Sequence, residues 1–125
     1  MKTCIDANVL LETLLEGRNK AHIAIEYLSS VENGAISPLT AHLYVHFGRN
    51  EKHAMADLLQ DLQAYRVLIV DGAVIDWAKT NVQGNHFEDA LQIGSAILDG
   101  CDRFVTFDGP LAKSYAQFID IQLLK

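Results

Sequence analysis

Three aspartates stand where a carboxylate could act in catalysis or hold a metal ion. Asp6 follows the apolar run 3–5, Asp108 follows the run 104–107, and Asp89 lies near the start of the helical pattern 87–98. Hard divalent ions such as Mg²⁺ and Mn²⁺ prefer oxygen ligands, and clustered carboxylates repel one another unless a cation neutralises them. If the three acids meet in space, the sequence therefore predicts a site for Mg²⁺ or Mn²⁺.

The three acids can meet only if the segments that carry them share one edge of a sheet. Short apolar runs alternate along the chain with helical patterns of about ten residues, which predicts right-handed crossovers and helices on both faces of a sheet. The predicted fold class is α/β, a three-layer α/β/α sandwich with a mainly parallel central sheet. Ligands of such sheets gather beyond the carboxyl ends of the strands, where Asp6 and Asp108 are expected. A helix over 87–98 that begins at this edge would bring Asp89 to the same place.

The apolar pattern also predicts the individual elements. Strands are expected over residues 2–6, 35–37, 67–70, 103–107 and 118–123, and helices over residues 8–16, 20–31, 39–47, 51–65, 87–98 and 110–115. Asp71 is expected to cap one further helix, while Gly48 and Gly100 are expected to end the helices before them. The run 67–70 is apolar throughout, which predicts a strand covered on both faces.

Composition limits the classes of function. With 125 residues, half of them hydrophobic, the chain fits a single domain over residues 1–125. No run approaches the roughly 20 apolar residues of a membrane helix, so a cytoplasmic protein with no membrane partner is expected. The net charge of −6 argues against binding nucleic acid by broad electrostatic attraction. An RNA substrate would therefore need metal ions or a basic partner to supply positive charge.

Two neighbouring polar residues could support the acids. Asn8 could orient Asp6 through its amide, and Thr106 could hydrogen-bond a carboxylate or a metal-bound water. Each also has a purely structural interpretation, because Asp and Asn are common helix caps and turn residues and Thr is common in strands. These alternatives stay open for every residue of the set.

Three motifs, in this order, resemble those of PIN domains. They are Asp6-Ala7-Asn8-Val9-Leu10-Leu11, Phe87-Glu88-Asp89-Ala90-Leu91 and Val105-Thr106-Phe107-Asp108. The similarity runs from Asp6 to the final strand, and the length matches the small prokaryotic members typified by VapC toxins. The resemblance implies a divalent-metal-dependent endoribonuclease that hydrolyses RNA phosphodiesters with a metal-activated water. It implies that Asp6, Asp89 and Asp108 are catalytic and bind Mg²⁺ or Mn²⁺, supported by Asn8 and Thr106, and that the chain is the toxin paired with a protein antitoxin.

The chain departs from the PIN pattern at one acid. PIN nucleases usually have a glutamate near the start of the helix after the second strand, but residues 37–46 contain no acid and the best alignment puts Leu43 there. In a register shifted by one, His42 would be a possible substitute ligand, and it shares a helical face with His46. The structural alternative for both histidines is an exposed helix surface or an interface.

The missing acid leaves a second function open. A catalytically degenerate PIN-fold protein could act as a partner-binding or RNA-binding module. Two other classes with acids at a sheet edge fit the sequence less well. A receiver domain would need paired acids after the first strand, and a haloacid-dehalogenase-type phosphatase would need a carboxylate in place of Asn8. A homodimer is also expected, because the helices between residues 39 and 62 carry hydrophobic side chains that would form a dimer surface unless they pack the core: Tyr44, Phe47, Met55 and Leu58.

Overall fold

A single five-stranded sheet forms the centre of the computed structural model, which describes residues 1–125. Every pair of neighbouring strands is parallel, in the order β3-β2-β1-β4-β5. The strands are β1 (Thr3–Ile5), β2 (Gly34–Ile36), β3 (Arg66–Val67), β4 (Arg103–Thr106) and β5 (Asp120–Leu123). The parallel sheet predicted from the alternation of apolar runs is confirmed.

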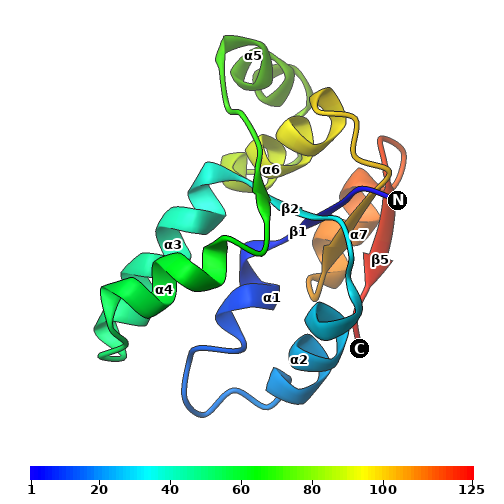
Figure 1. The fold of residues 1–125 in the computed structure, drawn as a ribbon. Coiled ribbons are helices and arrows are strands. Elements are labelled where there is room, and N and C mark those ends of the chain that lie inside the picture. The colour runs from blue at the N-terminus through cyan, green and yellow to red at the C-terminus, as the bar shows by residue number, and fades with distance from the viewer.

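Helices cover both faces of this sheet, as Figure 1 shows. They are α1 (Ala7–Leu11), α2 (Ala21–Ser30), α3 (Pro38–Asn50), α4 (Met55–Leu62), α5 (Gly72–Asn81), α6 (Phe87–Leu98) and α7 (Gly109–Tyr115). Successive strand residues point to opposite faces. Ile5 and Val105 therefore pack with α1 to α4, whereas their neighbours Cys4 and Phe104 pack with α5 to α7. The three-layer α/β/α architecture is confirmed.

Helix α1 is shorter than the sequence pattern predicts. It ends at Leu11 rather than Glu16, and the Glu12 side chain is buried. The Glu12 carboxylate accepts hydrogen bonds from the Arg18 guanidinium at 3.1 Å and from the Lys20 backbone N–H at 3.2 Å. Because a buried carboxylate needs such partners, the chain leaves the helix and folds back toward Glu12.

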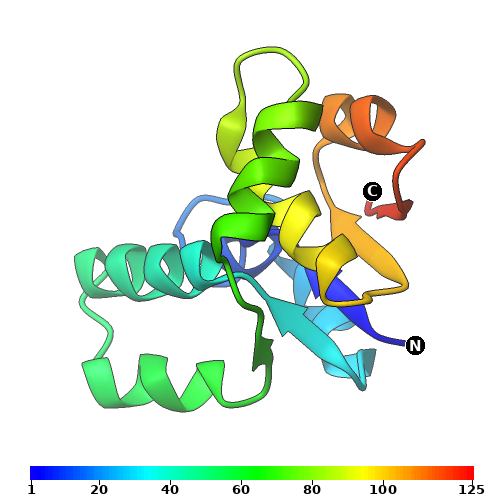
Figure 2. The same ribbon diagram turned by 90° about the horizontal axis from the view of Figure 1, so that it is seen from above.

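Helix α3 continues through Gly48, which was expected to end it. The helix reaches Asn50, and α4 then lies beside α3, as Figure 2 shows. A β-carbon at Gly48 would overlap with the Leu58 side chain, so this glycine allows the two helices to approach closely. Tyr44 and Leu58 are buried here, so of the two alternatives for these side chains, core packing holds for both.

Strand β3 differs from the covered strand expected over residues 67–70. It has only two residues and lies at the edge of the sheet. Val67 is 49% exposed and Ile69 is 67% exposed, and only Leu68 between them is buried. No strand pairs with the outer side of β3. The apolar character of the run 67–70 therefore does not reflect burial on both faces of the sheet.

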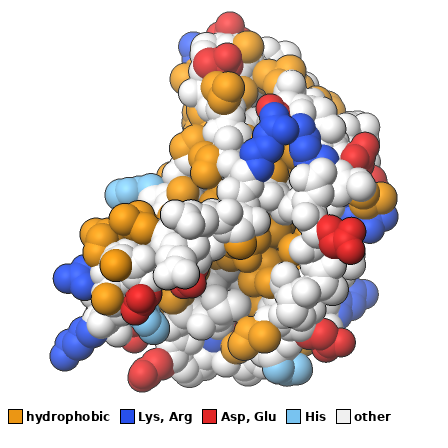
Figure 3. All heavy atoms as spheres, viewed as in Figure 1, with side chains coloured by type: hydrophobic (Ala, Val, Ile, Leu, Met, Phe, Trp, Pro, Cys, Tyr) orange, Lys and Arg blue, Asp and Glu red, His pale blue; other side chains and the backbone are white.

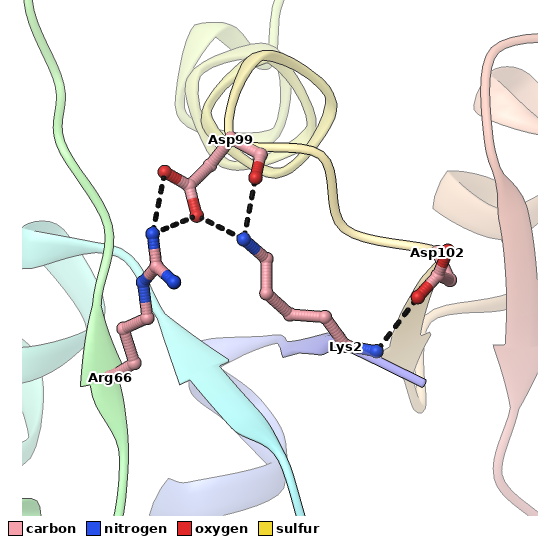
Figure 4. A network of polar contacts seen from close by, with 4 residues as sticks. All are labelled: Lys2, Arg66, Asp99 and Asp102. Carbon is pink, nitrogen blue, oxygen red and sulfur yellow. Dashed lines mark hydrogen bonds and ion pairs between the residues drawn. The ribbon is translucent and has the colours of Figure 1, made fainter.

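A network of charged groups fastens the amino ends of the strands, shown in Figure 4. The Lys2 ammonium donates to the Asp99 backbone carbonyl at 2.6 Å and to its carboxylate at 2.7 Å, and Arg66 reaches the same carboxylate at 3.1 Å. The hydrogen bond from Lys2 holds the pKa of Asp99 below its ordinary value. The backbone N–H of Lys2 also donates to Asp102 at 2.8 Å. These contacts join β1, β3 and the segment between α6 and β4.

None of the helices combines the length and the apolar character that a membrane crossing requires.

Candidate active site

Asp6 stands between β1 and α1, at the carboxyl end of the central strand. It is the residue before the first turn of α1, yet its side chain makes no capping hydrogen bond. Its carboxylate instead accepts a hydrogen bond of 2.7 Å from the Thr106 hydroxyl and is only 3% exposed. The capping interpretation therefore does not explain Asp6, and the expected hydrogen bond from Thr106 to a carboxylate is present.

The Thr106 hydroxyl also connects Asp6 to the segment that carries Asp108. It accepts a hydrogen bond of 2.9 Å from the Asp108 backbone N–H while it donates to Asp6. One oxygen of Asp108 accepts from the Leu111 backbone N–H at 3.1 Å, which caps α7. One oxygen of Asp108 therefore acts as a helix cap, as the structural interpretation expected, while its other oxygen is available to bind a cation.

Asp89 lies in the first turn of α6, where its carboxylate makes no hydrogen bond to a side chain. Burial and the negative charges of Asp6 and Asp108 raise its pKa from the ordinary 3.8 to about 6, and the nearby His86 opposes this shift. Burial also raises the pKa of Asp6, whereas hydrogen bonds from Thr106 and Gln92 lower it. Since the charges of Asp6 and Asp108 both raise the pKa of Asp89, the structure brings the three predicted acids to one edge of the sheet.

A cavity of about 360 Å³ opens beside these acids. Asp89 and Asp108 form part of its wall, together with Glu88 and His86. Asp6 is buried and does not line the cavity. The cavity is therefore an open, largely polar recess with two of the three aspartates at its surface.

The donor set fits a hard divalent cation by its chemistry. It consists of oxygen atoms from carboxylates that repel one another, and such groups bind Mg²⁺ or Mn²⁺. No group of three or more His, Cys, Asp or Glu side chains is already arranged to hold a metal ion. Binding a cation would therefore require rotation of the aspartate side chains, and Asp89 is the least constrained of them.

Two other predicted residues lie apart from the acids. Asn8 is exposed on α1 and its amide makes no hydrogen bond to Asp6. His42 is exposed on α3 and stacks on His46 with 5.9 Å between the ring centroids. The structure does not bring His42 into a group with the three aspartates.

Sequence reasoning missed a buried polar network next to Asp6. The Gln92 side chain accepts hydrogen bonds from the Ala7 backbone N–H at 3.4 Å and from the Thr40 hydroxyl at 3.2 Å. Ser37 in turn accepts from the Thr40 backbone N–H at 3.1 Å. A signal was present, because Gln92 lies three residues after Asp89 and therefore on the same face of an otherwise apolar helix.

A model of the PIN domain matches residues 3–115. The chain belongs to the PIN domain family. The matched part of this PIN domain contains all three aspartates, Thr106 and Gln92. No curated protein matches the sequence closely enough to serve as a relative.

Solved structures share the fold over almost the whole chain. The PIN domain superposes on VapC20 of Mycobacterium tuberculosis, a Sarcin-Ricin loop cleaving toxin, with a TM-score of 0.75, 16% identity and coverage of 97% of this chain and 99% of that one. FitAcB from Neisseria gonorrhoeae gives a TM-score of 0.70, 21% identity and 95% coverage of each chain. A toxin-antitoxin complex from Klebsiella pneumoniae gives 0.69, 19% identity and coverage of 97% and 96%. At these identities the likeness concerns the fold.

Replacement of Asp89 by asparagine should make the metal-free protein more stable near neutral pH. The folded-state pKa of Asp89, about 6, exceeds the ordinary 3.8, so folding disfavours its charged form. The folded state therefore retains this proton to higher pH than the unfolded state. As a result, Asp89 lowers the free energy of unfolding as pH rises from about 4 to about 7. In EDTA, Asp89→Asn should melt above wild type at pH 7.5 and close to it at pH 4.

Thermal melts followed by circular dichroism would measure this difference. Added Mn²⁺ should then stabilise the wild type more than Asp89→Asn, because a ligand that binds the folded state raises its stability. Equal melting temperatures of the two proteins at pH 7.5 in EDTA would contradict the assigned electrostatic environment.

Proposed function

We propose that this PIN domain is a divalent-metal-dependent endoribonuclease. The observation that carries the proposal is the approach of three carboxylates from separate parts of the chain, because burial, together with the negative charges of Asp6 and Asp108, raises the pKa of Asp89 to about 6. Carboxylates held in this way are costly in the folded protein unless a cation offsets their charge. Members of this family that are nucleases generally use divalent metal ions, and VapC relatives are typically ribonucleases.

The residues of the site would have distinct roles. Asp6, held by Thr106, would be the buried metal ligand, and Asp89 and Asp108 would hold the ion from the cavity wall. When bound, Mg²⁺ or Mn²⁺ supplies a water of lowered pKa and stabilises charge that develops on the phosphate. The recess of about 360 Å³ would receive an RNA phosphodiester. Because the chain has a net charge of −6, the ion would also offset repulsion between the protein and the RNA backbone.

A binding-only PIN domain is the second candidate. It is favoured by the absence of an acid in residues 37–46 and of a group of three ligands already in place. In that case the aspartates would be remnants of a nuclease site and the chain would bind a partner or RNA without cutting it.

RNA cleavage in the presence of Mn²⁺ tests the nuclease proposal. Wild type should cut structured RNA, and Asp6→Asn and Asp89→Asn should each lose at least about a hundredfold in rate, since a metal ligand supplies several kcal/mol of transition-state stabilisation. Asp76→Asn, on the exposed surface of α5, is the matched control and should keep full activity.

Cleavage would be followed by gel electrophoresis with Mg²⁺, Mn²⁺ and Co²⁺ in turn. If wild type and both site variants are equally inactive with every ion, the nuclease proposal is wrong and the binding-only candidate replaces it.

Restoring an acid on α3 should strengthen metal binding. Leu43 lies three residues after Thr40, whose hydroxyl contacts Gln92, so these two residues share the helix face toward the site. We expect Leu43→Glu to tighten Mn²⁺ binding about tenfold, because a further carboxylate adds a hard oxygen ligand. His42→Glu adds the same charge on the exposed side of α3 and should change the affinity little.

Isothermal titration calorimetry with Mn²⁺ would measure both variants. A larger gain from His42→Glu than from Leu43→Glu would instead support the shifted register, in which residue 42 faces the metal.

We further propose that the chain is the toxin of a toxin-antitoxin pair. Support comes from relatives described as toxin-antitoxin complexes and from an apolar groove of about 520 Å³, visible as the central hollow in Figure 3. Its wall combines residues of α1, α2, α3 and α4 with residues that follow α1 and α4: Leu10, Thr13, Leu28, Tyr44, Gln60, Asp61, Ala64 and Tyr65. An apolar segment of an antitoxin would fit this groove. A homodimer remains part of the proposal, with exposed Met55 and Leu59 of α4 available to a second copy.

A charged side chain in the groove should prevent antitoxin binding without loss of the fold. Ala64 is exposed and lines the groove, so Ala64→Arg should weaken binding of the protein encoded by the adjacent reading frame by about a hundredfold, through steric overlap and desolvation of the charge. Gln63→Arg, exposed but outside the groove wall, is the matched control. Binding would be measured by biolayer interferometry. Unchanged affinity of Ala64→Arg would exclude the groove as the docking site.

A further inference from the structure

Gln92 is a polar side chain in the apolar interior of the protein. It is only 1% exposed and lies one turn after Asp89 on α6. A buried amide needs partners for both its oxygen and its nitrogen. No buried side-chain nitrogen or oxygen in the structure lacks a hydrogen-bond partner. The contacts of Gln92 therefore define which way its amide points.

The oxygen of the Gln92 amide accepts hydrogen bonds from two donors. It accepts from the Ala7 backbone N–H at 3.4 Å and from the Thr40 hydroxyl at 3.2 Å. With the oxygen turned to these donors, Gln92 is bonded to the backbone N–H of the residue directly after Asp6, and its polar side chain also lowers the pKa of the Asp6 carboxylate. Asp6 thus receives a hydrogen bond from Thr106, and Gln92 holds the backbone next to it.

The position of Thr40 is itself fixed. The Ser37 hydroxyl caps α3 by accepting from the Thr40 backbone N–H at 3.1 Å, and it also lies 3.2 Å from the Thr40 hydroxyl. Helix α3 contributes no carboxylate to the site, but through Thr40 it contributes a donor to Gln92. The network therefore runs from α3 through α6 to the junction of β1 and α1.

We propose that Gln92 is a positioning residue of the metal site, joining the helix that carries Asp89 to the strand end that carries Asp6. Gln92 cannot act as a charged ligand, so its effect on a bound ion is exerted through Asp6. Partners of this kind orient a metal ligand, and their loss typically lowers metal affinity about 10-fold to 100-fold. The inference rests on the proposed metal-dependent function.

A purely structural role makes different predictions. Suppose that Gln92 serves only as the hydrogen-bond acceptor for the Ala7 backbone N–H and the Thr40 hydroxyl. Removal of any bond of the network should then lower stability without a specific effect on metal binding. Two variants separate these cases. Gln92→Met keeps the length of the side chain but removes its hydrogen bonds to Ala7 and Thr40 and its polar interaction with Asp6. Thr40→Val removes one bond to Gln92 and leaves the amide next to Ala7 and Asp6 in place.

Calorimetric titration with Mn²⁺ in the absence of RNA, combined with thermal melts, tests the proposal. Gln92→Met should weaken Mn²⁺ binding at least about tenfold and lower kcat with little change in KM for RNA. Thr40→Val should lower the melting temperature but keep an affinity close to that of wild type. Wild-type affinity in Gln92→Met, or an equal loss in Thr40→Val, would overturn the positioning role.

The two failures can be told apart. If wild type binds Mn²⁺ and Gln92→Met binds it equally well, only the role of Gln92 is wrong. If wild type takes up no Mn²⁺, the metal-dependent function fails and the role of Gln92 fails with it.

A measurement on the wild type covers the case in which Gln92→Met does not fold. In a nitrogen-proton correlation spectrum, the side-chain amide resonances of Gln92 should shift during titration with Mg²⁺, while those of exposed Gln63 should stay in place. No shift at Gln92 when Mg²⁺ binds would overturn the proposal.

Discussion

Burial of carboxylates close to one another governs the site of this PIN domain. Asp6 and Asp89 both have a raised pKa, with burial as the largest cause, and Asp108 adds its charge to each of them. The surrounding protein stabilises the acids unequally. Asp6 receives a hydrogen bond from Thr106, and the polar Gln92 side chain also lowers its pKa, whereas no hydrogen bond lowers the pKa of Asp89. Asp89, the acid with the fewest partners, lies at the cavity wall together with Asp108.

The opposite edge of the same sheet shows that the fold can neutralise its acids when it contains the cations. There, Asp99 is held by Lys2 and Arg66, and its pKa is lowered. None of the ion pairs in the structure includes Asp6, Asp89 or Asp108. The two ends of the parallel strands therefore differ in how their charged groups are paired. The amino ends are closed by pairs of opposite charge, and the carboxyl ends keep like charges together, which is the arrangement that gains most from a metal ion.

The parts of the fold that depend on local patterns could be predicted from the sequence. The bounds of α6 were predicted at Phe87 and Leu98 because its apolar period is strong and Gly100 follows it. Edge strand β3 and the passage of α3 through Gly48 could not be predicted, since they depend on what packs against each element. For the site, acids at strand ends were visible in the sequence. The network through Gln92 was not, because it joins residues 52 positions apart.

A neutral amide beside Asp6 has a physical consequence for the balance between stability and metal affinity. A carboxylate in that place would add a ligand, but it would also add a fourth like charge to Asp6, Asp89 and Asp108 and raise the cost of folding without metal. The uncharged Gln92 side chain instead restrains the backbone next to Asp6, because its oxygen accepts from the Ala7 backbone N–H and from the Thr40 hydroxyl. The proposed metal site would thus give up part of its attraction for a cation and gain a metal-free state in which fewer charges oppose one another. Such a site would bind its ion more weakly but hold Asp6 in a defined position.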